Sequence, residues 1–179
     1  MIERSIIAQN ITNLTDARYF AAWGVEYVSF NAIPESEHYL QPEKIKEIKD
    51  WLEGPKTLIE TNSLEFDELA DGLILSTIYS SLPMSKECFY RASFEDLEKS
   101  LPEGHYIIKI NSSDQLKKLN QLPENHLLGL HLYLDITDIK LEDTSLLGDY
   151  GLAIQGGEEE QPGVKSFDEL DDLYDLLMD

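Results

Sequence analysis

The sequence predicts an α/β protein, a compact (β/α)8 or TIM barrel with shortened helices, that forms a single domain over residues 1–179. Eight short apolar runs follow one another along the chain, and helical patterns separate most of them. This alternation is typical of parallel strands joined by crossover helices, and eight is the number of strands that closes such a barrel. The helices must be short, because these barrels usually need ~200 residues or more. An open α/β sheet is the alternative fold.

The runs that we expect to be strands are rich in Ile, Val, Tyr and Phe, which favour extended structure. They span residues 5–9, 26–31, 56–61, 72–77, 88–91, 105–110, 127–134 and 150–154. Each is short and ends at polar residues or glycine, as expected for buried strands of a parallel sheet.

Helices are expected between these runs, over residues 16–23, 42–52, 64–70, 94–101, 113–119 and 166–177, with one or two further turns at 143–147. Their ends carry capping signals. Thr15 is expected to cap the first helix, and Gly24 to end it. Pro42 favours the first position of the second helix, and Ser93 is expected to cap the fourth. The last helix has its apolar residues on one face, which would close the barrel.

Composition limits the partners and the compartment. The chain has 35 Asp and Glu against 14 Lys and Arg, a formal net charge of -21. Such an acidic surface repels phosphate backbones and anionic lipids, so we expect no nucleic acid and no membrane partner. Cys88 is the only cysteine, which excludes an internal disulfide and a cysteine metal cluster. With no signal sequence and no apolar run of ~18 residues, we expect a cytoplasmic protein without a metal or a cofactor.

Polar residues follow the expected strands, at the end where barrels of this class build their sites. In chain order they are Gln9, Asn10, Asn31, Thr61, Asn62, Ser76, Thr77, Arg91, Asn111, Ser112, Asp135, Gln155, Gly156 and Gly157. Amides and hydroxyls dominate this set, and these groups bind and orient a ligand. Few groups there can transfer a proton near neutral pH: Asp135, Glu60 and, if they face inward, His38 or His131. We therefore expect a small-molecule ligand.

Sequence motifs at both ends of the chain resemble a known family. Ile11-Thr12-Asn13 and Asp16-Ala17 follow the first strand, and the stretch 23–30 and the loop 34–43 continue the likeness. Residues 156–165, with Pro162-Gly163-Val164-Lys165, complete the likeness near the C-terminal end of the chain. These motifs are similar to those of the phosphoribosylanthranilate isomerases, whose first strand ends in Lys-x-Cys-Gly-Ile-Thr followed by Asn-x-x-Asp-Ala. The middle of the chain does not match.

The resemblance implies an activity and the residues that would perform it. The family carries out an Amadori rearrangement of a phosphorylated aminosugar in tryptophan biosynthesis, which needs a base and an acid. Gln9 occupies the position of the family's catalytic Cys base, and Asn10 that of the Gly. The acid, an Asp, falls at Asn111 by strand count, or at Asp135 in a shifted alignment. His38 stands where the family has an Arg that holds the substrate carboxylate.

Other residues are candidates for ligand binding. Arg91 lies at the right end of its strand to hold an anionic group, and it could equally form an ion pair. Gly156 and Gly157 are a candidate phosphate cradle, since glycine lets backbone N–H groups approach an anion, or else a tight turn. Asn10, Asn31 and His38 complete the expected ligand-binding set. Cys88 begins its strand, far from this end, and is expected to be structural.

Three functions remain open. The chain could be an isomerase of the family's type, acting on a sugar phosphate. It could be a pseudoenzyme, a non-catalytic barrel that binds a small anionic ligand, because carboxamides replace the base and the acid. It could also be a barrel that binds a protein partner, and a homodimer is possible in each case.

Overall fold

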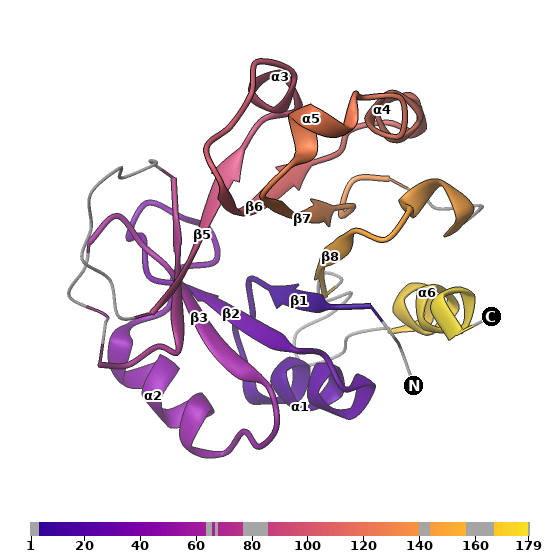
Figure 1. Ribbon diagram of the computed structural model, residues 1–179. Coiled ribbons are helices and arrows are strands. Elements are labelled where there is room, and N and C mark those ends of the chain that lie inside the picture. The colour runs from indigo at the N-terminus through magenta and orange to yellow at the C-terminus, as the bar shows by residue number, and fades with distance from the viewer. Residues whose placement is uncertain are drawn as a thin grey trace.

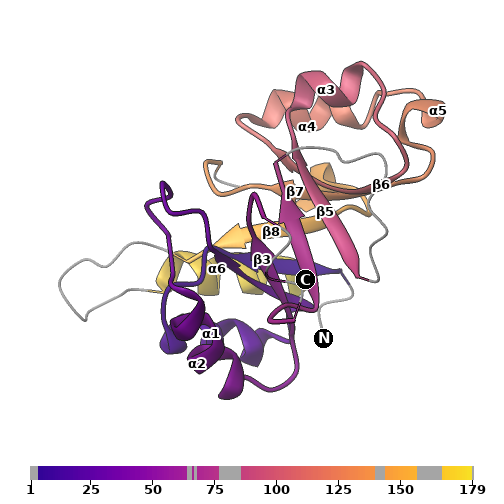
Figure 2. The same ribbon diagram turned by 90° about the vertical axis from the view of Figure 1, so that its left-hand side faces the viewer.

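The computed structural model describes residues 4–63, 66, 68–76, 86–139, 144–156 and 167–178, and it shows a closed barrel of eight parallel strands. Each strand pairs with the next along the chain, and β8 pairs with β1 to close the ring (Figures 1 and 2). The predicted compact (β/α)8 barrel is confirmed, and the open sheet is wrong.

The strands are β1 (Ile6–Gln9), β2 (Tyr27–Asn31), β3 (Lys56–Glu60), β4 (Gly72–Leu75), β5 (Glu87–Ala92), β6 (Gly104–Lys109), β7 (Leu130–Asp135) and β8 (Gly151–Gln155). The helices are α1 (Leu14–Trp23), α2 (Pro42–Asp50), α3 (Phe94–Glu98), α4 (Ser113–Leu119), α5 (Glu124–Leu127), the 3-10 turn η2 (Thr144–Leu147) and α6 (Asp168–Met178).

The helices form two groups around the barrel. Helices α1, α2 and α6 lie beside β1–β3, and α3, α4 and α5 cluster beside β5–β7 (Figures 1 and 2). They are short, as predicted: α3 has 5 residues and α5 has 4. The described part of the connection from β7 to β8 contains only η2. Among the described residues, no helix combines the length and apolar composition needed to cross a bilayer.

The first helix begins one residue after Asn13, and not at the predicted cap Thr15. The Asn13 side chain accepts a hydrogen bond from the Asp16 N–H at 2.9 Å, with extended backbone angles at Asn13. Asn is a stronger N-cap than Thr, which explains the shift. Gly24 ends the helix in the left-handed conformation at φ 78°, as predicted.

Two further boundaries test the capping signals. Ser93 caps α3 as predicted, in a capping box in which the Asp96 side chain also accepts from the Ser93 N–H. The predicted start of the seventh strand at residue 127 is wrong, because Leu127 ends α5. Pro123 precedes that helix, and Gly129, with φ 76°, turns the chain into β7.

The barrel interior holds an apolar layer to which every strand contributes one side chain. These buried side chains form a cluster separate from the outer core: Ile7, Tyr27, Leu58, Ile74, Phe89, Ile107, Tyr133 and Ala153. Because strand side chains alternate between faces, residues two positions later also point inward, nearer the C-terminal mouth. All of these positions are polar: Gln9, Ser29, Glu60, Arg91, Lys109, Asp135 and Gln155 on seven strands, and Ser76 directly after β4. The mouth therefore rests on an apolar floor.

Truncating a central ring of this layer should destabilise the barrel. Phe89 is fully buried, with ring centroids 5.2 Å from Tyr27 and 5.5 Å from Tyr133. We expect Phe89→Ala to lower the free energy of unfolding by about 3–5 kcal/mol, since the variant loses ring contacts and leaves a cavity. Urea denaturation measures this loss. A loss below about 1 kcal/mol would contradict the described layer.

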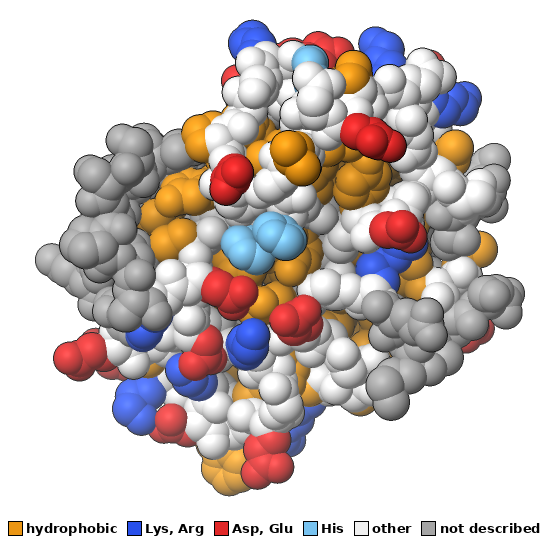
Figure 3. Space-filling view, in the orientation of Figure 1, with side chains coloured by type: hydrophobic (Ala, Val, Ile, Leu, Met, Phe, Trp, Pro, Cys, Tyr) orange, Lys and Arg blue, Asp and Glu red, His pale blue; other side chains and the backbone are white. Residues whose placement is uncertain are grey.

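The N-terminal end of the barrel carries a histidine pair. His105 on β6 and His131 on β7 are register partners, and their rings stack with centroids 4.7 Å apart. Adjacent histidine side chains lie at the centre of the face in Figure 3, with acidic side chains nearby. Burial lowers the pKa of His105 below its ordinary value of 6.5, and His131 lowers it further, whereas Glu87 and Glu26 oppose the shift.

This lowered pKa predicts a dependence of stability on pH. Below about pH 6.5 the unfolded chain protonates His105 before the folded chain does, so the contribution of neutral His105 is present above that pH and is lost as the pH falls. We expect the urea midpoint to fall less steeply between about pH 7 and pH 5 in His105→Gln than in the unchanged protein. Equal slopes in the two proteins would contradict this assignment.

Candidate functional site

The C-terminal ends of the strands surround a cavity of about 550 Å³. Its lining comes from five strand ends, from Asn10 after β1 and from the loop after β2. The lining residues are Asn10, Asn31, Glu35, Ser36, Glu37, His38, Glu60, Arg91, Lys109 and Gln155. All ten are polar or charged, so the cavity suits a polar ligand.

An ion cluster occupies the centre of this mouth. Arg91 donates two hydrogen bonds to the Glu60 carboxylate, from Nε to Oε1 at 2.6 Å and from Nη2 to Oε2 at 2.7 Å. Its Nη1 lies 3.7 Å from Asp135 Oδ2. The Glu60 and Asp135 side chains are only 10% and 9% exposed. Two buried carboxylates therefore share one guanidinium.

The charge of Arg91 is secure in this setting. Burial by itself would lower its pKa, but the hydrogen bonds and charge of Glu60, together with the charge of Asp135, outweigh burial and raise the pKa above its ordinary value. The expectation left open an anion-binding or an ion-pairing role for Arg91, and the geometry shows the ion pair.

Gln9 links the ion cluster to the loop after β7. Its Oε1 accepts a hydrogen bond from Arg91 Nη2 at 3.1 Å, and its Nε2 donates to Thr137 Oγ1 at 3.1 Å. Thr137 in turn donates to Asp135 Oδ1, from its hydroxyl at 2.7 Å and from its backbone N–H at 3.2 Å. Gln9, which is 1% exposed, is thus fixed at both ends of its carboxamide.

A second chain of hydrogen bonds crosses the rim. Asn10 Nδ2 donates to Gln155 Oε1 at 2.8 Å, and Gln155 Nε2 lies 3.2 Å from His38 Nε2. Glu37 Oε1 lies 3.4 Å from the same His38 nitrogen. Asn10 adopts a left-handed conformation at φ 56°, which Asn tolerates better than most residues and which aims its side chain across the rim.

Two residues hold the surroundings of the mouth. Asn31 Oδ1 accepts from the Ile33 N–H at 3.0 Å, and its carbonyl accepts from Leu40 at 2.8 Å, which fixes the loop that carries His38. Lys109 Nζ lies 2.6 Å from Asp138 Oδ2, so this lysine is already paired with a carboxylate outside the barrel interior.

Not all predicted site residues meet at the mouth. Gln9, Asn10, Asn31, His38, Arg91 and Asp135 do. Asn111 is exposed, does not line the cavity, and its N–H bonds Gln115 Oε1 at 2.8 Å. Gly156 is the last described residue after β8, and Gly157 lies outside the described residues.

Seven residues of the mouth were not among the predicted site residues: Glu35, Ser36, Glu37, Glu60, Lys109, Thr137 and Gln155. Glu60 was noted as a residue that could transfer a proton and Gln155 as a polar residue that follows a strand, while Lys109 and Thr137 were missed. Alternation could have found Lys109, because it lies two residues after the inward-facing Ile107. No sequence signal identifies Thr137, whose role depends on the turn that Asp135 makes with it.

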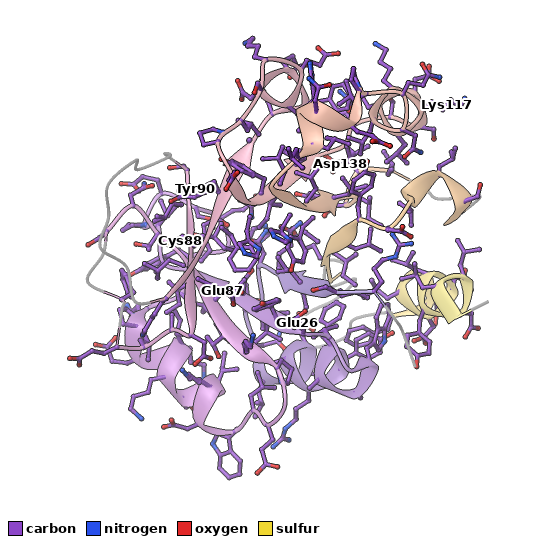
Figure 4. The ribbon with its side chains drawn as sticks, viewed as in Figure 1. Glu26, Glu87, Cys88, Tyr90, Lys117 and Asp138 are labelled. Carbon is purple, nitrogen blue, oxygen red and sulfur yellow. The ribbon has the colours of Figure 1, made fainter. Side chains whose placement is uncertain are left out.

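Cys88 lies on β5 beside Tyr90, away from the mouth (Figure 4). It is half-buried and packs against the outer core, and not against the inward-facing layer. This agrees with the expected structural role. In the described part of the chain, no three His, Cys, Asp or Glu side chains come together in a way that could hold a metal ion.

Removing Arg91 should be costly, because it leaves two buried carboxylates without a cation. We expect Arg91→Met to lower the free energy of unfolding by about 3–5 kcal/mol, and the double variant Arg91→Met/Glu60→Leu to recover part of the loss. Urea denaturation measures both. Lys46→Met is the control, because it removes an exposed pair with Asp50, worth at most about 1 kcal/mol. Equal losses for Arg91→Met and Lys46→Met would contradict the buried cluster.

Comparison with solved structures places this barrel beside the phosphoribosylanthranilate isomerases. TrpF from Jonesia denitrificans superposes with a TM-score of 0.73 at 16% identity, covering 98% of this chain and 97% of that chain. Phosphoribosyl anthranilate isomerase from Thermus thermophilus gives 0.71 at 20% identity, covering 97% and 98%.

A third structure, phosphoribosyl anthranilate isomerase in complex with reduced 1-(o-carboxyphenylamino)-1-deoxyribulose 5-phosphate, gives a TM-score of 0.67 at 16% identity and covers 98% of both chains. No protein-family model and no curated protein sequence matches this chain. The predicted resemblance is confirmed for the fold, and it extends through the middle of the chain, where the sequence motifs do not match.

Proposed function

We propose that this chain is a phosphoribosylanthranilate-isomerase-like barrel that binds a small polar molecule in its C-terminal mouth without catalysing the Amadori rearrangement. The fold and the sequence motifs at both ends support the likeness to the phosphoribosylanthranilate isomerases. The observation that supports the absence of catalysis is the hydrogen bonding of the Gln9 carboxamide.

The rearrangement needs a base that removes a proton from carbon and an acid that protonates the ring oxygen. A carboxamide does neither near neutral pH. In this barrel the carboxamide of Gln9 is also engaged at both ends, by Arg91 and by Thr137. The position of the family's base therefore holds a buried and fixed hydrogen-bonding group that does not line the cavity.

The two candidates for the acid do not restore the chemistry. Asn111 is exposed and lies outside the cavity lining. Asp135 accepts two hydrogen bonds from Thr137 on Oδ1 and faces the Arg91 guanidinium with Oδ2. In this arrangement Oδ1 accepts both hydrogen bonds and Oδ2 lies 3.7 Å from the guanidinium of Arg91, whereas a general acid must carry a proton that it can donate.

Ligand binding, by contrast, needs only a cavity of suitable volume and a few polar groups, and the mouth has both. Small-molecule sites commonly have volumes of roughly 300–1,000 Å³ and a few convergent polar groups. The cavity of about 550 Å³ lies in this range, and its floor and walls are fixed by hydrogen bonds before a ligand arrives. Such preorganisation lowers the entropic cost of binding.

An assay of phosphoribosylanthranilate consumption tests the proposal. We expect no rate above that of the uncatalysed reaction, because losing an acid or a base costs about 10²–10⁴-fold and the positions of the family's base and acid hold Gln9 and Asn111. Gln9→Cys alone should not introduce turnover, since the acid is still missing. A genuine phosphoribosylanthranilate isomerase assayed in parallel verifies the substrate. Turnover by the unchanged protein that Asp135→Asn abolishes, with the fold intact by circular dichroism, would overturn the proposal.

A further inference from the structure

The described part of the mouth holds more negative than positive charge. Arg91 and Lys109 are the cations of the cavity lining. Arg91 is shared by Glu60 and Asp135, and Lys109 lies 2.6 Å from Asp138. Two cations thus face three carboxylates, and both cations are already paired.

Asp135 is the carboxylate with the weakest pairing. Its Oδ1 accepts two hydrogen bonds from Thr137, but its Oδ2 makes none with the described residues. The nearest cationic atom to Oδ2 is Arg91 Nη1 at 3.7 Å, beyond hydrogen-bonding distance. The side chain is only 9% exposed, and no hydrogen-bond donor among the described residues occupies Oδ2, so this oxygen is open to a donor from a ligand. A donor with positive charge would satisfy it.

The rim repeats this charge pattern. Exposed Glu35 and Glu37 line the cavity together with His38. An approaching anion would meet repulsion from several carboxylates, whereas a cation would be attracted.

The remaining polar groups suit hydroxyls. Asn10, Asn31 and Gln155 line the cavity, and each carboxamide offers both a donor and an acceptor. Hydroxyl groups need this combination, because they donate one hydrogen bond and accept others.

We propose that the mouth binds a small hydroxylated amine, of the chemical class of amino sugars and amino alcohols. Its ammonium group lies against Asp135 and Glu60, and its hydroxyls bond the carboxamides of Asn10, Asn31 and Gln155. This inference rests on the proposed ligand-binding function and replaces the expected anionic ligand with a cationic one.

Two probes of nearly equal shape separate charge from hydroxyl recognition. Tris(hydroxymethyl)aminomethane carries three hydroxymethyl groups and one amine, which is protonated at about pH 7, and pentaerythritol has a fourth hydroxymethyl in place of the amine. We expect the amine to raise the melting temperature of the full chain more than pentaerythritol does at equal concentration and ionic strength. Inorganic phosphate, the third probe, should give no increase.

Variants place the effect at the mouth. Asp135→Asn should remove the difference between the amine and pentaerythritol. Asp172→Asn, on the exposed face of α6, removes the same charge elsewhere and should keep the difference. If Asp135→Asn does not fold, Glu60→Gln replaces it, and the three probes on the unchanged protein still test the inference.

The outcomes distinguish the inference from the proposed function. Stabilisation by phosphate, lost in Gly156→Asp, would overturn the cationic ligand but leave a ligand-binding barrel. Equal stabilisation by the amine and pentaerythritol would overturn the role of positive charge and would leave the recognition of hydroxyls in place. No response to any of the three probes would overturn the inference, while turnover of phosphoribosylanthranilate would overturn the proposed function.

Discussion

The ion cluster of Arg91, Glu60 and Asp135 constrains the whole mouth of this barrel. Three different strands supply these side chains, and all three lie one step above the apolar layer that contains Phe89 and Ile107. Water is largely excluded there, so each charge must find its partner within the protein. Gln9 is drawn into the cluster as an acceptor for Arg91, and this fixes the chemistry that the first strand can offer.

The sequence motif after the first strand, which resembles the isomerases, has a structural role in this chain. Ile11 and Ala17 are buried in the outer core, Asn13 caps α1, and Asp16 donates its N–H to that cap. These residues build the first β-α unit. Gln9, which lies two residues before Ile11 at the end of β1, faces the barrel interior. The likeness therefore lies in residues that the fold requires, and it says less about residues that would react.

The number and order of strands could be predicted because each strand is an apolar run bounded by turn residues. The site was harder, since it depends on where each strand stops. Lys109 and Asn111 lie on the same side of the sixth run, but β6 ends at Lys109, and Ser112 caps α4 immediately afterwards. Two residues thus decide whether a polar side chain enters the cavity. Thr137 depends on a turn with Asp135 that no pattern in the sequence indicates.

If the mouth binds a ligand as proposed, the hydrogen bonds among its own polar groups affect which ligand it selects. Any ligand must compete with the internal bonds of Gln9, Asn10 and Gln155, so hydrogen bonding alone gives little net affinity. Binding energy is then available mainly where the protein leaves a group incompletely paired. Asp135 Oδ2 is such a group, at 3.7 Å from its nearest cation. On the proposed function, carboxamides at the positions of the base and the acid would turn such a barrel from proton transfer to the selection of a ligand by charge.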